Sequence, residues 1–282
     1  MPDRDRYIPG VPCWVDATQP DPEAAVDFYG RLFGWEFEDT MPPGSQGKYY
    51  MARLRGRDVA AISPVPEGAP AIATWNTYIW VSSAVETTAR VREAGGQVLM
   101  EPVDVFDAGH TAMFADPEGA AFGVWQPGAM RGAQIVNEPA SVSFNDLHTR
   151  DVEGAKRFYG AVFDWTTMTV DGAEMWTLPG YGDHLEELNP GTHEQAGEYG
   201  VPGFEDVVAS IDPIADDQPE VPAHWGVTFG TDDADALAAR VTELGGRVLV
   251  PPFDAPWIRM TVLADPQGAA FVASKFAPEN RS

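Results

Sequence analysis

The feature that most constrains the fold of this chain is a seven-residue segment that occurs twice. The first copy reads Asp116-Pro117-Glu118-Gly119-Ala120-Ala121-Phe122, and the second, at 265–271, differs only by Gln in place of Glu. Asp-Pro-x-Gly is typical of a tight turn, because Asp accepts backbone hydrogen bonds, Pro restricts φ and Gly adopts a positive φ. Apolar residues flank both copies, so each copy predicts a strand, a tight turn and a second strand.

Two further motifs also occur twice. Phe28-Tyr29-Gly30-x-x-Phe33-x-Trp35 returns at 158–165, and Gly95-Gly96-x-Val98-Leu99 returns at 245–249. A repeat of this length indicates two homologous domains. Because the offset between the copies grows along the chain, the second domain carries an insertion. We predict a first domain at 8–127, a linker rich in Pro, Gly and Asn at 128–140, and a second domain at 141–277 with an inserted loop near 180–203.

Within a repeat, the hydrophobic pattern switches between strand and helix periods. A helix is expected to begin at Asp21-Pro22-Glu23 and to end at Gly34, and another spans 85–94. The predicted strands of the first repeat are 14–18, 35–40, 48–54, 58–63, 74–82, 97–105, 110–115 and 121–126. The order is βαβββ followed by βαβββ in each repeat. The predicted fold class is therefore α+β, with two such modules in each domain.

Charge and cysteine content exclude several classes of protein. The formal net charge is −25, from 43 Asp and Glu against 18 Lys and Arg. Such a surface repels phosphate backbones and anionic lipid, so we expect neither nucleic acid nor membrane partners. Cys13 is the only cysteine, which rules out an intrachain disulfide and a cysteine-based zinc site. The first residues lack the apolar core of a signal peptide, so a cytoplasmic location is expected.

These motifs together resemble the vicinal oxygen chelate superfamily, which includes glyoxalases, bleomycin-resistance proteins and extradiol dioxygenases. The matching residues are Asp21-Pro22-Glu23-Ala24-Ala25-x-x-Phe28-Tyr29, Phe33-Gly34-Trp35, Gly95-Gly96-x-Val98 and Asp116-Pro117-x-Gly119, with their second-repeat counterparts. The chain is most similar to tandem two-domain members named glyoxalase-like proteins or hydroxylases. The resemblance implies that each domain curls its strands into a half-open barrel around a pocket.

The resemblance also implies where a divalent metal would bind. Metal-using members place His or Glu in the first strand, at the start of the fifth strand and seven residues after the Asp of Asp-Pro-x-Gly. The corresponding positions in the two domains are Trp14 and Phe144, Asn76 and Gly226, and Gly123 and Val272. None supplies the imidazole or carboxylate that such an ion needs. We therefore predict that there is no metal and no other cofactor.

Polar residues of the second domain suggest acid–base chemistry instead. Phe144, Asp146 and His148 alternate along a strand and share one side of it. His224 begins the fifth strand of the same domain. An Asp beside a His is the pairing that fixes an imidazole tautomer and tunes it as a general base. We predict Asp146, His148 and His224 as catalytic, the alternative being that His148 is an ordinary histidine at a strand end.

A further cation and the inserted loop complete the predicted catalytic site. Arg259, at the position of His110 in the first domain, is expected to be catalytic by holding an oxyanion. The inserted loop is predicted to be a lid, a binding loop or a solvated segment. The acidic run 212–220 is interpreted as an exposed linker. Aromatic residues are expected to line the pocket of the first domain, and the inserted loop contains His and Tyr. The predicted substrate-binding residues are Trp14, Asp16, Asn76, Tyr78, His110, Phe144, His184 and Tyr199.

The sequence thus predicts a metal-independent, glyoxalase-like enzyme of the lyase, isomerase or cyclase type. Its substrate would be a small organic molecule, such as a secondary metabolite, and its oligomeric state a monomer or homodimer. Two other hypotheses stay open. One is a non-catalytic small-molecule binder of the resistance type, and the other is a metal-dependent glyoxalase-like enzyme whose ligands lie outside the family positions.

Overall fold

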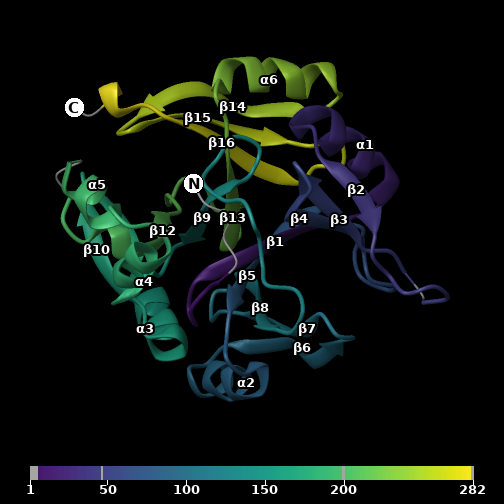
Figure 1. Ribbon diagram of the computed structural model, residues 1–282, viewed down its shortest axis with the longest axis horizontal. Helices are drawn as coiled ribbons and strands as arrows, with labels where there is room; N and C mark the ends of the chain where they lie inside the picture. Colours follow the sequence, from purple (N-terminus) through teal and green to yellow (C-terminus); the bar gives the residue numbers. More distant parts are fainter. Residues whose placement is uncertain (1–5, 46, 199–200, 281–282) are drawn as a thin grey trace. The chain divides into compact units, whose positions relative to one another are not determined.

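A computed structural model describes residues 6–45, 47–198 and 201–280 (Figure 1). The helices are α1 (Pro22–Phe33), α2 (Ala84–Glu93), α3 (Val152–Phe163), α4 (Tyr181–Leu188), α5 (Thr192–Glu198), α6 (Ala234–Glu243), η1 (Phe204–Asp206) and η2 (Pro278–Asn280). The strands of the first repeat are β1 (Pro12–Gln19), β2 (Glu36–Asp39), β3 (Tyr50–Leu54), β4 (Arg57–Pro64), β5 (Thr74–Trp80), β6 (Gln97–Val105), β7 (Gly109–Ala115) and β8 (Ala121–Pro127). Those of the second are β9 (Val142–Thr149), β10 (Thr166–Val170), β11 (Ala173–Thr177), β12 (Val207–Pro213), β13 (His224–Gly230), β14 (Arg247–Ala255), β15 (Ile258–Ala264) and β16 (Ala270–Phe276).

The strands form two eight-stranded mixed sheets, one for each repeat. Their orders are β2-β3-β4-β1-β5-β8-β7-β6 and β10-β11-β12-β9-β13-β16-β15-β14. In every module the last strand returns to pair in parallel with the first, as β4 does with β1 and β12 with β9. The predicted α+β class and the repeated βαβββ order are confirmed. None of the helices among the described residues is long and apolar enough to cross a membrane.

The chain packs into two compact units that do not follow the order of the repeats. Unit 1 comprises Met1–Cys13, Thr77–Gly132 and Asn145–Trp225, and so holds most of the modules β5–β8 and β9–β12. Unit 2 comprises the three remaining segments, and holds most of β1–β4 and β13–β16. Each unit therefore draws one module from each repeat. The predicted domain boundaries describe the repeat in the sequence and stay a prediction.

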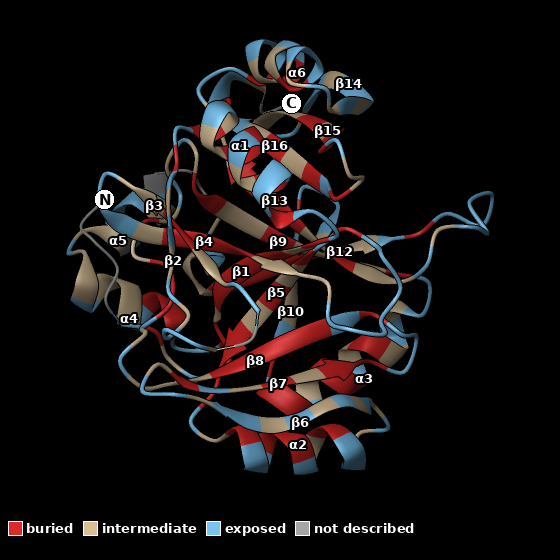
Figure 2. Cartoon of the chain, turned by 90° about the vertical axis from the view of Figure 1, so that its right-hand side faces the viewer, coloured by how far each residue is buried: buried red, intermediate tan, exposed pale blue. Residues whose placement is uncertain are grey.

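Helix α1 shows how local sequence leads to the core of unit 2. The side chain of Asp21 accepts a hydrogen bond from the backbone of Ala24, and Gly34, at φ +72°, ends the helix. Phe33 is buried and its ring lies 5.1 Å from that of Phe229. Burying such a ring contributes roughly 1.5–3 kcal/mol. Buried residues are red in Figure 2, where β1, β4 and β8 are red along much of their length.

The repeated turn of the second copy is anchored by a buried hydrogen-bond network in unit 2. Oδ1 of Asp265 accepts from three backbone N–H groups of its own turn, at 2.7–2.9 Å. Oδ2 accepts from Nε2 of Gln19 at 2.7 Å and from the hydroxyl of Tyr29 at 3.0 Å. That hydroxyl in turn accepts from Nε1 of Trp75 at 3.0 Å. The turn thus connects β16 of the second repeat to α1 and β5 of the first.

Unit 1 contains the same network built from the other halves of the repeats. Asp116 accepts from the backbone of its turn, and its Oδ2 accepts from the hydroxyl of Tyr159 at 3.2 Å. Tyr159 accepts from Nε1 of Trp225 at 2.9 Å. Burial raises the pKa of Asp116, and burial together with Asp116 raises the pKa of Tyr159. The aromatic motif and the turn motif recur together because they contact each other.

The single Glu-to-Gln difference between the two turns follows from what each side chain binds. Oε2 of Glu118 accepts hydrogen bonds from the hydroxyl of Thr149 and from the backbone N–H groups of Arg150 and Asp151. Gln267 instead accepts from the backbone N–H of Asp21 and donates to its carbonyl, both at 2.7 Å. A carboxylate suits the site that presents only donors, and an amide suits the site that presents one donor and one acceptor.

The insertion in the second repeat is helical, whereas the sequence predicted a loop. It contains α4 and α5, and residues 199–200, including the predicted Tyr199, lie outside the described residues. No side chain caps α4 locally, but Oδ1 of Asp206 accepts from the backbone N–H of Gly182 at 2.7 Å. The cap comes from a residue 24 positions away, which local sequence patterns do not show.

Candidate functional site

The candidate site is built on β9 and β12 of unit 1. Along β9, Asp146 and His148 are half-buried while their neighbours Leu147 and Thr149 are fully buried, so the two polar residues share one side of the strand. The parallel register places Ser210 beside Asp146 and Asp212 beside His148. The strand pairing therefore collects four polar side chains.

Ser210 joins the two carboxylates of this cluster. Its Oγ lies 2.9 Å from Oδ1 of Asp146 and 2.9 Å from Oδ2 of Asp212. A serine hydroxyl carries one proton, so it donates to one carboxylate at a time. The two acidic groups are therefore held close together by a single donor, next to the two histidines described below.

The rings of His148 and His224 stack on each other. Their centroids are 4.4 Å apart and their planes differ by 7°. Nδ1 of His224 lies 2.9 Å from the backbone carbonyl oxygen of Pro222. Because a carbonyl only accepts, Nδ1 carries the proton, and Nε2 of the neutral ring keeps its lone pair. This tautomer is the one that a general base requires at Nε2.

Burial keeps both histidines neutral near pH 7. Burial lowers the pKa of His148, and the nearby carboxylate of Asp212 offsets part of this effect. Burial also lowers the pKa of His224; the carbonyl of Pro222 and the carboxylate of Asp146 oppose this, and His148 reinforces it. The two imidazoles are thus bases in the ground state, with carboxylates close enough to stabilise an imidazolium once it forms.

The lowered pKa values predict how stability depends on pH. A histidine with a lower pKa in the folded state stabilises the fold above its unfolded value, about 6.5, and this contribution is lost as the pH falls through the folded value. We expect thermal unfolding midpoints to fall from pH 7 toward pH 5, and to fall less in the His148→Gln/His224→Gln double variant. Parallel curves for the two proteins would contradict the pKa directions.

We call Asp146, His148, Ser210, Asp212 and His224 the acid–base cluster. The first repeat lacks this cluster at the equivalent positions. In the register of β1 with β4, Asp16 lies beside Ala61 and Thr18 beside Ser63. The position of His224, the first residue of β13, is Thr74 at the start of β5. Only the aspartate is common to both repeats. The two histidines and the second carboxylate of the cluster therefore occur in the second repeat and not at the equivalent positions of the first.

The polar residues predicted to bind substrate in the first repeat form a closed network in unit 2. Asp16 is 4% exposed and accepts from the amide of Asn76 at 2.8 Å and from the hydroxyl of Tyr49 at 3.3 Å. That hydroxyl accepts from Nε1 of Trp14 at 3.0 Å, and the Asn76 amide also donates to Thr18. Burial and the Asp16 carboxylate raise the pKa of Tyr49. These contacts hold the side chains to one another, and their predicted role in substrate binding stays a prediction.

The remaining predicted residues lie in different surroundings. Arg259 forms ion pairs with Asp235 and Asp254, at 2.6 and 2.9 Å, so its guanidinium is engaged by carboxylates of unit 2. His110 is exposed on β7, and Phe144 is half-buried on the same side of β9 as Asp146.

Tyr78 and His184 have aromatic or close-packed neighbours. A Cβ on Gly123 would lie 2.2 Å from Cδ1 of Tyr78, so the tyrosine ring fills the space beside that glycine. The ring of His184 stacks on Tyr181 with centroids 6.5 Å apart. Within the described residues, Nε2 of His184 is buried without a hydrogen-bond partner.

Two members of the cluster, Ser210 and Asp212, were not predicted. Asp212 was interpreted as part of an exposed linker, but it belongs to β12 and contacts Ser210. An alignment of the two repeats that allows for the insertion would have identified both residues. Ala61 and Ser63 of the first repeat correspond, through the shared register with Asp16 and Asp146, to Ser210 and Asp212 of the second. An apolar residue and a hydroxyl are replaced by a hydroxyl and a carboxylate.

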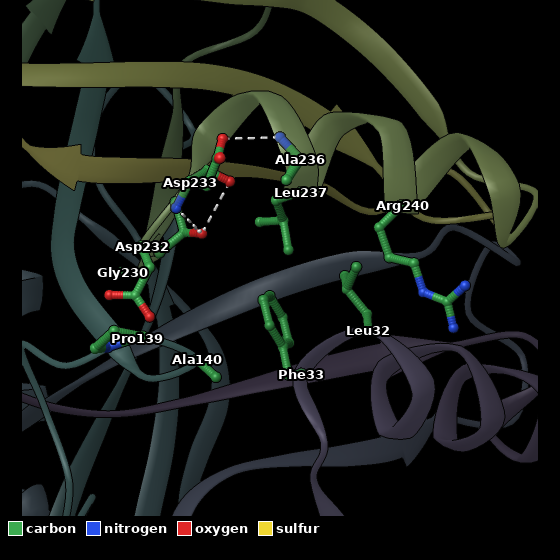
Figure 3. A pocket seen from close by; sticks show the side chains of 11 residues that line it. Leu32, Phe33, Pro139, Ala140, Gly230, Asp232, Asp233, Ala236, Leu237 and Arg240 are labelled. Atoms are coloured by element: carbon green, nitrogen blue, oxygen red, sulfur yellow. Dashed lines mark hydrogen bonds between the residues drawn. The ribbon is translucent and has the colours of Figure 1, made fainter.

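A groove of unit 2 is separate from this cluster. Figure 3 shows Leu32 and Phe33 of α1 facing Leu237 of α6 across it. Its volume is about 330 Å³, and no residue of the acid–base cluster lines it. Asp233 at one end caps α6 by accepting from the backbone of Ala236. The lining is largely apolar, includes Asp232, Asp233 and Arg240, and contains no histidine.

The family's metal positions do not fit a divalent ion in this chain. Trp14 donates to Tyr49, Asn76 donates to Asp16, and Gly123 is covered by the ring of Tyr78. Indole and a donating amide nitrogen are not ligands for such an ion. In the parts of the chain that the structure describes, no group of three or more His, Cys, Asp or Glu side chains is arranged to hold a metal.

Comparison with known proteins gives family matches across both repeats. Residues 14–124 match the Glyoxalase/Bleomycin resistance protein/Dioxygenase superfamily, and residues 142–273 match the glyoxalase-like domain. CFP32 of Mycobacterium tuberculosis, provisionally named a glyoxylase, is 40% identical over 282 residues, covering 99% of this chain and 100% of that protein. DnrV of Streptomyces peucetius, named an anthracycline biosynthesis protein, is 36% identical over 281 residues, covering 94% and 93%.

Solved structures agree on the fold. The Mn(II)-bound glyoxalase from Novosphingobium aromaticivorans superposes with a TM-score of 0.59 at 17% identity, over 95% of this chain and 83% of that one. The 2,3-dioxygenase LapB from Pseudomonas sp. KL28 superposes with a TM-score of 0.60 at 10% identity, over 95% and 93%. At these identities the likeness concerns the fold alone.

Proposed function

Because the chain belongs to the glyoxalase/bleomycin resistance/dioxygenase superfamily and lacks the family's metal ligands, we propose that it is a metal-independent enzyme. It moves a proton on a small organic molecule, in an isomerisation, cyclisation, dehydration or lyase reaction. The observation that carries the proposal is the stacked pair His148 and His224 with the proton of His224 held on Nδ1. A superfamily fold alone does not specify a reaction, so the argument rests on this site.

The geometry supports one sequence of proton movements. Nε2 of His224 takes a proton from a carbon next to a substrate carbonyl, and the electron pair of that C–H bond moves onto the carbonyl oxygen. An N–H of neutral His148 donates a hydrogen bond to this oxygen, the role of a preorganised donor in such sites. The electron pair then moves back from the oxygen, and the imidazolium of His224 gives its proton either to a different atom of the substrate or to a group that leaves from the neighbouring carbon with its bonding electrons.

The carboxylates favour the charged intermediate of this sequence. In the register Asp146 lies beside Ser210 and Asp212 beside His148, and both carboxylates share the hydroxyl of Ser210. Their negative charge stabilises the imidazolium that exists only after proton abstraction. The role proposed for Arg259 from the sequence passes to His148, because the guanidinium is engaged by Asp235 and Asp254.

The same charges restrict the substrate. Two carboxylates beside the histidines, on a chain of net charge −25, disfavour an anionic ligand. A neutral or cationic secondary metabolite fits this environment. Relatives named for anthracycline biosynthesis, at 35% and 36% identity, support a place in secondary metabolism.

Small-molecule binding without turnover is the second candidate function. It is favoured by the first repeat, which lacks the acid–base cluster, and by the apolar groove of unit 2.

A chelator experiment separates the candidate functions. Untagged protein treated with a chelator is incubated with a panel of anthracycline-type compounds, and products are followed by mass spectrometry. We expect turnover to survive the treatment. Turnover that is lost and restored by Mn²⁺ would contradict metal independence, and binding without product would support the binder.

A further inference from the structure

Arg150 makes contacts that no part of the proposed reaction uses. It follows β9 directly, two residues after His148. Its Nη2 donates hydrogen bonds to the backbone carbonyl oxygens of Gln218 at 2.6 Å and of Val221 at 2.7 Å. A guanidinium terminal nitrogen carries two N–H groups, so both bonds form at once. The side chain therefore ties two carbonyls of one segment to the end of β9.

The segment that Arg150 holds is the one that leads into His224. Residues 214–223 connect β12 to β13 without regular structure, and most of them are exposed. Val221 immediately precedes Pro222, whose carbonyl accepts the proton of His224 Nδ1. Displacing this segment would move both the acceptor that fixes the tautomer and the ring itself.

The backbone that carries Arg150, at the end of β9, is itself held in place. Its backbone N–H donates to Oε2 of Glu118 at 3.0 Å, and the flanking Thr149 and Asp151 donate to the same oxygen. Burial would raise the pKa of Glu118, but these hydrogen bonds outweigh it and lower the pKa. The carboxylate is therefore charged at neutral pH, and it holds the end of β9 in place.

We propose that Arg150 is a positioning residue that clamps residues 218–222 to the end of β9 and so holds the ring of His224 on the ring of His148. The first repeat has Pro20 at the equivalent position, which offers no side-chain donor, and it has neither histidine. The clamp and the histidine pair thus occur together in the second repeat. The effect of the clamp on catalysis rests on the proposed function. The effect of the clamp on the position of the His224 ring does not.

The test follows the histidine rings directly. The chain has only five histidines, so their imidazole NMR signals can be assigned from single His→Gln variants. We compare wild type with Arg150→Ala, with Arg150→Lys, and with Arg157→Ala as a charge-matched control. Arg157 is exposed on α3 and lies 3.8 Å from Asp151. Lysine keeps a charge and three N–H donors, so it is expected to restore part of the clamp.

In Arg150→Ala, we expect the pKa of His224 to rise toward its ordinary value, because the ring loses burial and its contact with His148. Arg157→Ala should match wild type and Arg150→Lys should lie between. With a substrate in hand, kcat should fall roughly 10- to 100-fold while KM changes little, as for a misplaced catalytic group.

An Arg150→Ala titration of His148 and His224 that matches wild type overturns the proposal, whatever the activity. So does a change of equal size in Arg157→Ala. Thermal unfolding of each variant separates a local change from loss of the fold. Failure of the proposed function is a different result, namely full turnover in the His224→Gln variant, and it leaves the titration result to decide the clamp on its own.

Discussion

His224→Gln is expected to lower kcat by roughly 10²- to 10⁴-fold, the usual contribution of a positioned base, and His148→Ala by roughly 10²- to 10³-fold, the contribution of one donor to the oxyanion. Glutamine keeps a polar group of similar size but neither accepts nor delivers a proton at neutral pH. Substrate dissociation constants, measured by quenching of tryptophan fluorescence, should change only a few-fold. The effect falls on kcat because the imidazolium forms only after proton abstraction.

The two histidines are expected to act as a unit. The double variant should lose little more than the worse single variant, since the base and the donor to the oxyanion serve one step. His193→Gln is the matched control, because His193 is exposed on α5 and its ring contacts Asp183 and Glu205. Full turnover in either single variant, or an equal loss in the control, would refute the assignment.

The second large effect concerns stability. We expect Asp265→Ala to lower the free energy of unfolding by about 3–5 kcal/mol, because it leaves several buried donors without an acceptor. These are the backbone N–H groups of the turn, Nε2 of Gln19 and the hydroxyl of Tyr29. Chemical denaturation of the full chain measures the loss. Asp265→Asn should lose less, since its amide oxygen still accepts from the turn.

An exposed carboxylate of the same unit provides the comparison. Asp27 on α1 pairs with Arg31, and its side chain is 70% exposed. Asp27→Ala should therefore change stability by no more than about 0.5 kcal/mol. A loss below 1 kcal/mol for Asp265→Ala would contradict this prediction. It would mean that the hydrogen bonds linking the turn to Tyr29 and Trp75 contribute little to stability.

The fold was predictable because its signals are local and occur twice. Asp21-Pro22 and Gly34 bound a helix wherever they occur in this arrangement, and α1 spans Pro22–Phe33 between them. The turn chemistry of Asp116 likewise needs only its own neighbours. The way in which the modules pack is not local. Nothing in the order of the residues shows that Tyr29 bonds to Asp265 of the other repeat.

The candidate site was predictable in part, for the same reason. Asp146 and His148 share a strand, so their common side follows from its period alone. Ser210 and Asp212 join them through the register of β9 with β12, which the insertion separates in sequence. No sequence pattern distinguishes Arg150 from an ordinary surface arginine. Its two carbonyl partners lie 68 and 71 residues away, and only the folded chain brings them to it.

Solvent hydrogen exchange tests the central claim most directly. Chelator-treated protein is incubated in D₂O with a compound that it turns over, and deuterium on the substrate carbons is followed by NMR. The proposal predicts exchange that is as fast with chelator as without it, and that is abolished in His224→Gln. Exchange that needs an added divalent ion, or that persists in His224→Gln, would contradict a metal-independent proton transfer through these histidines.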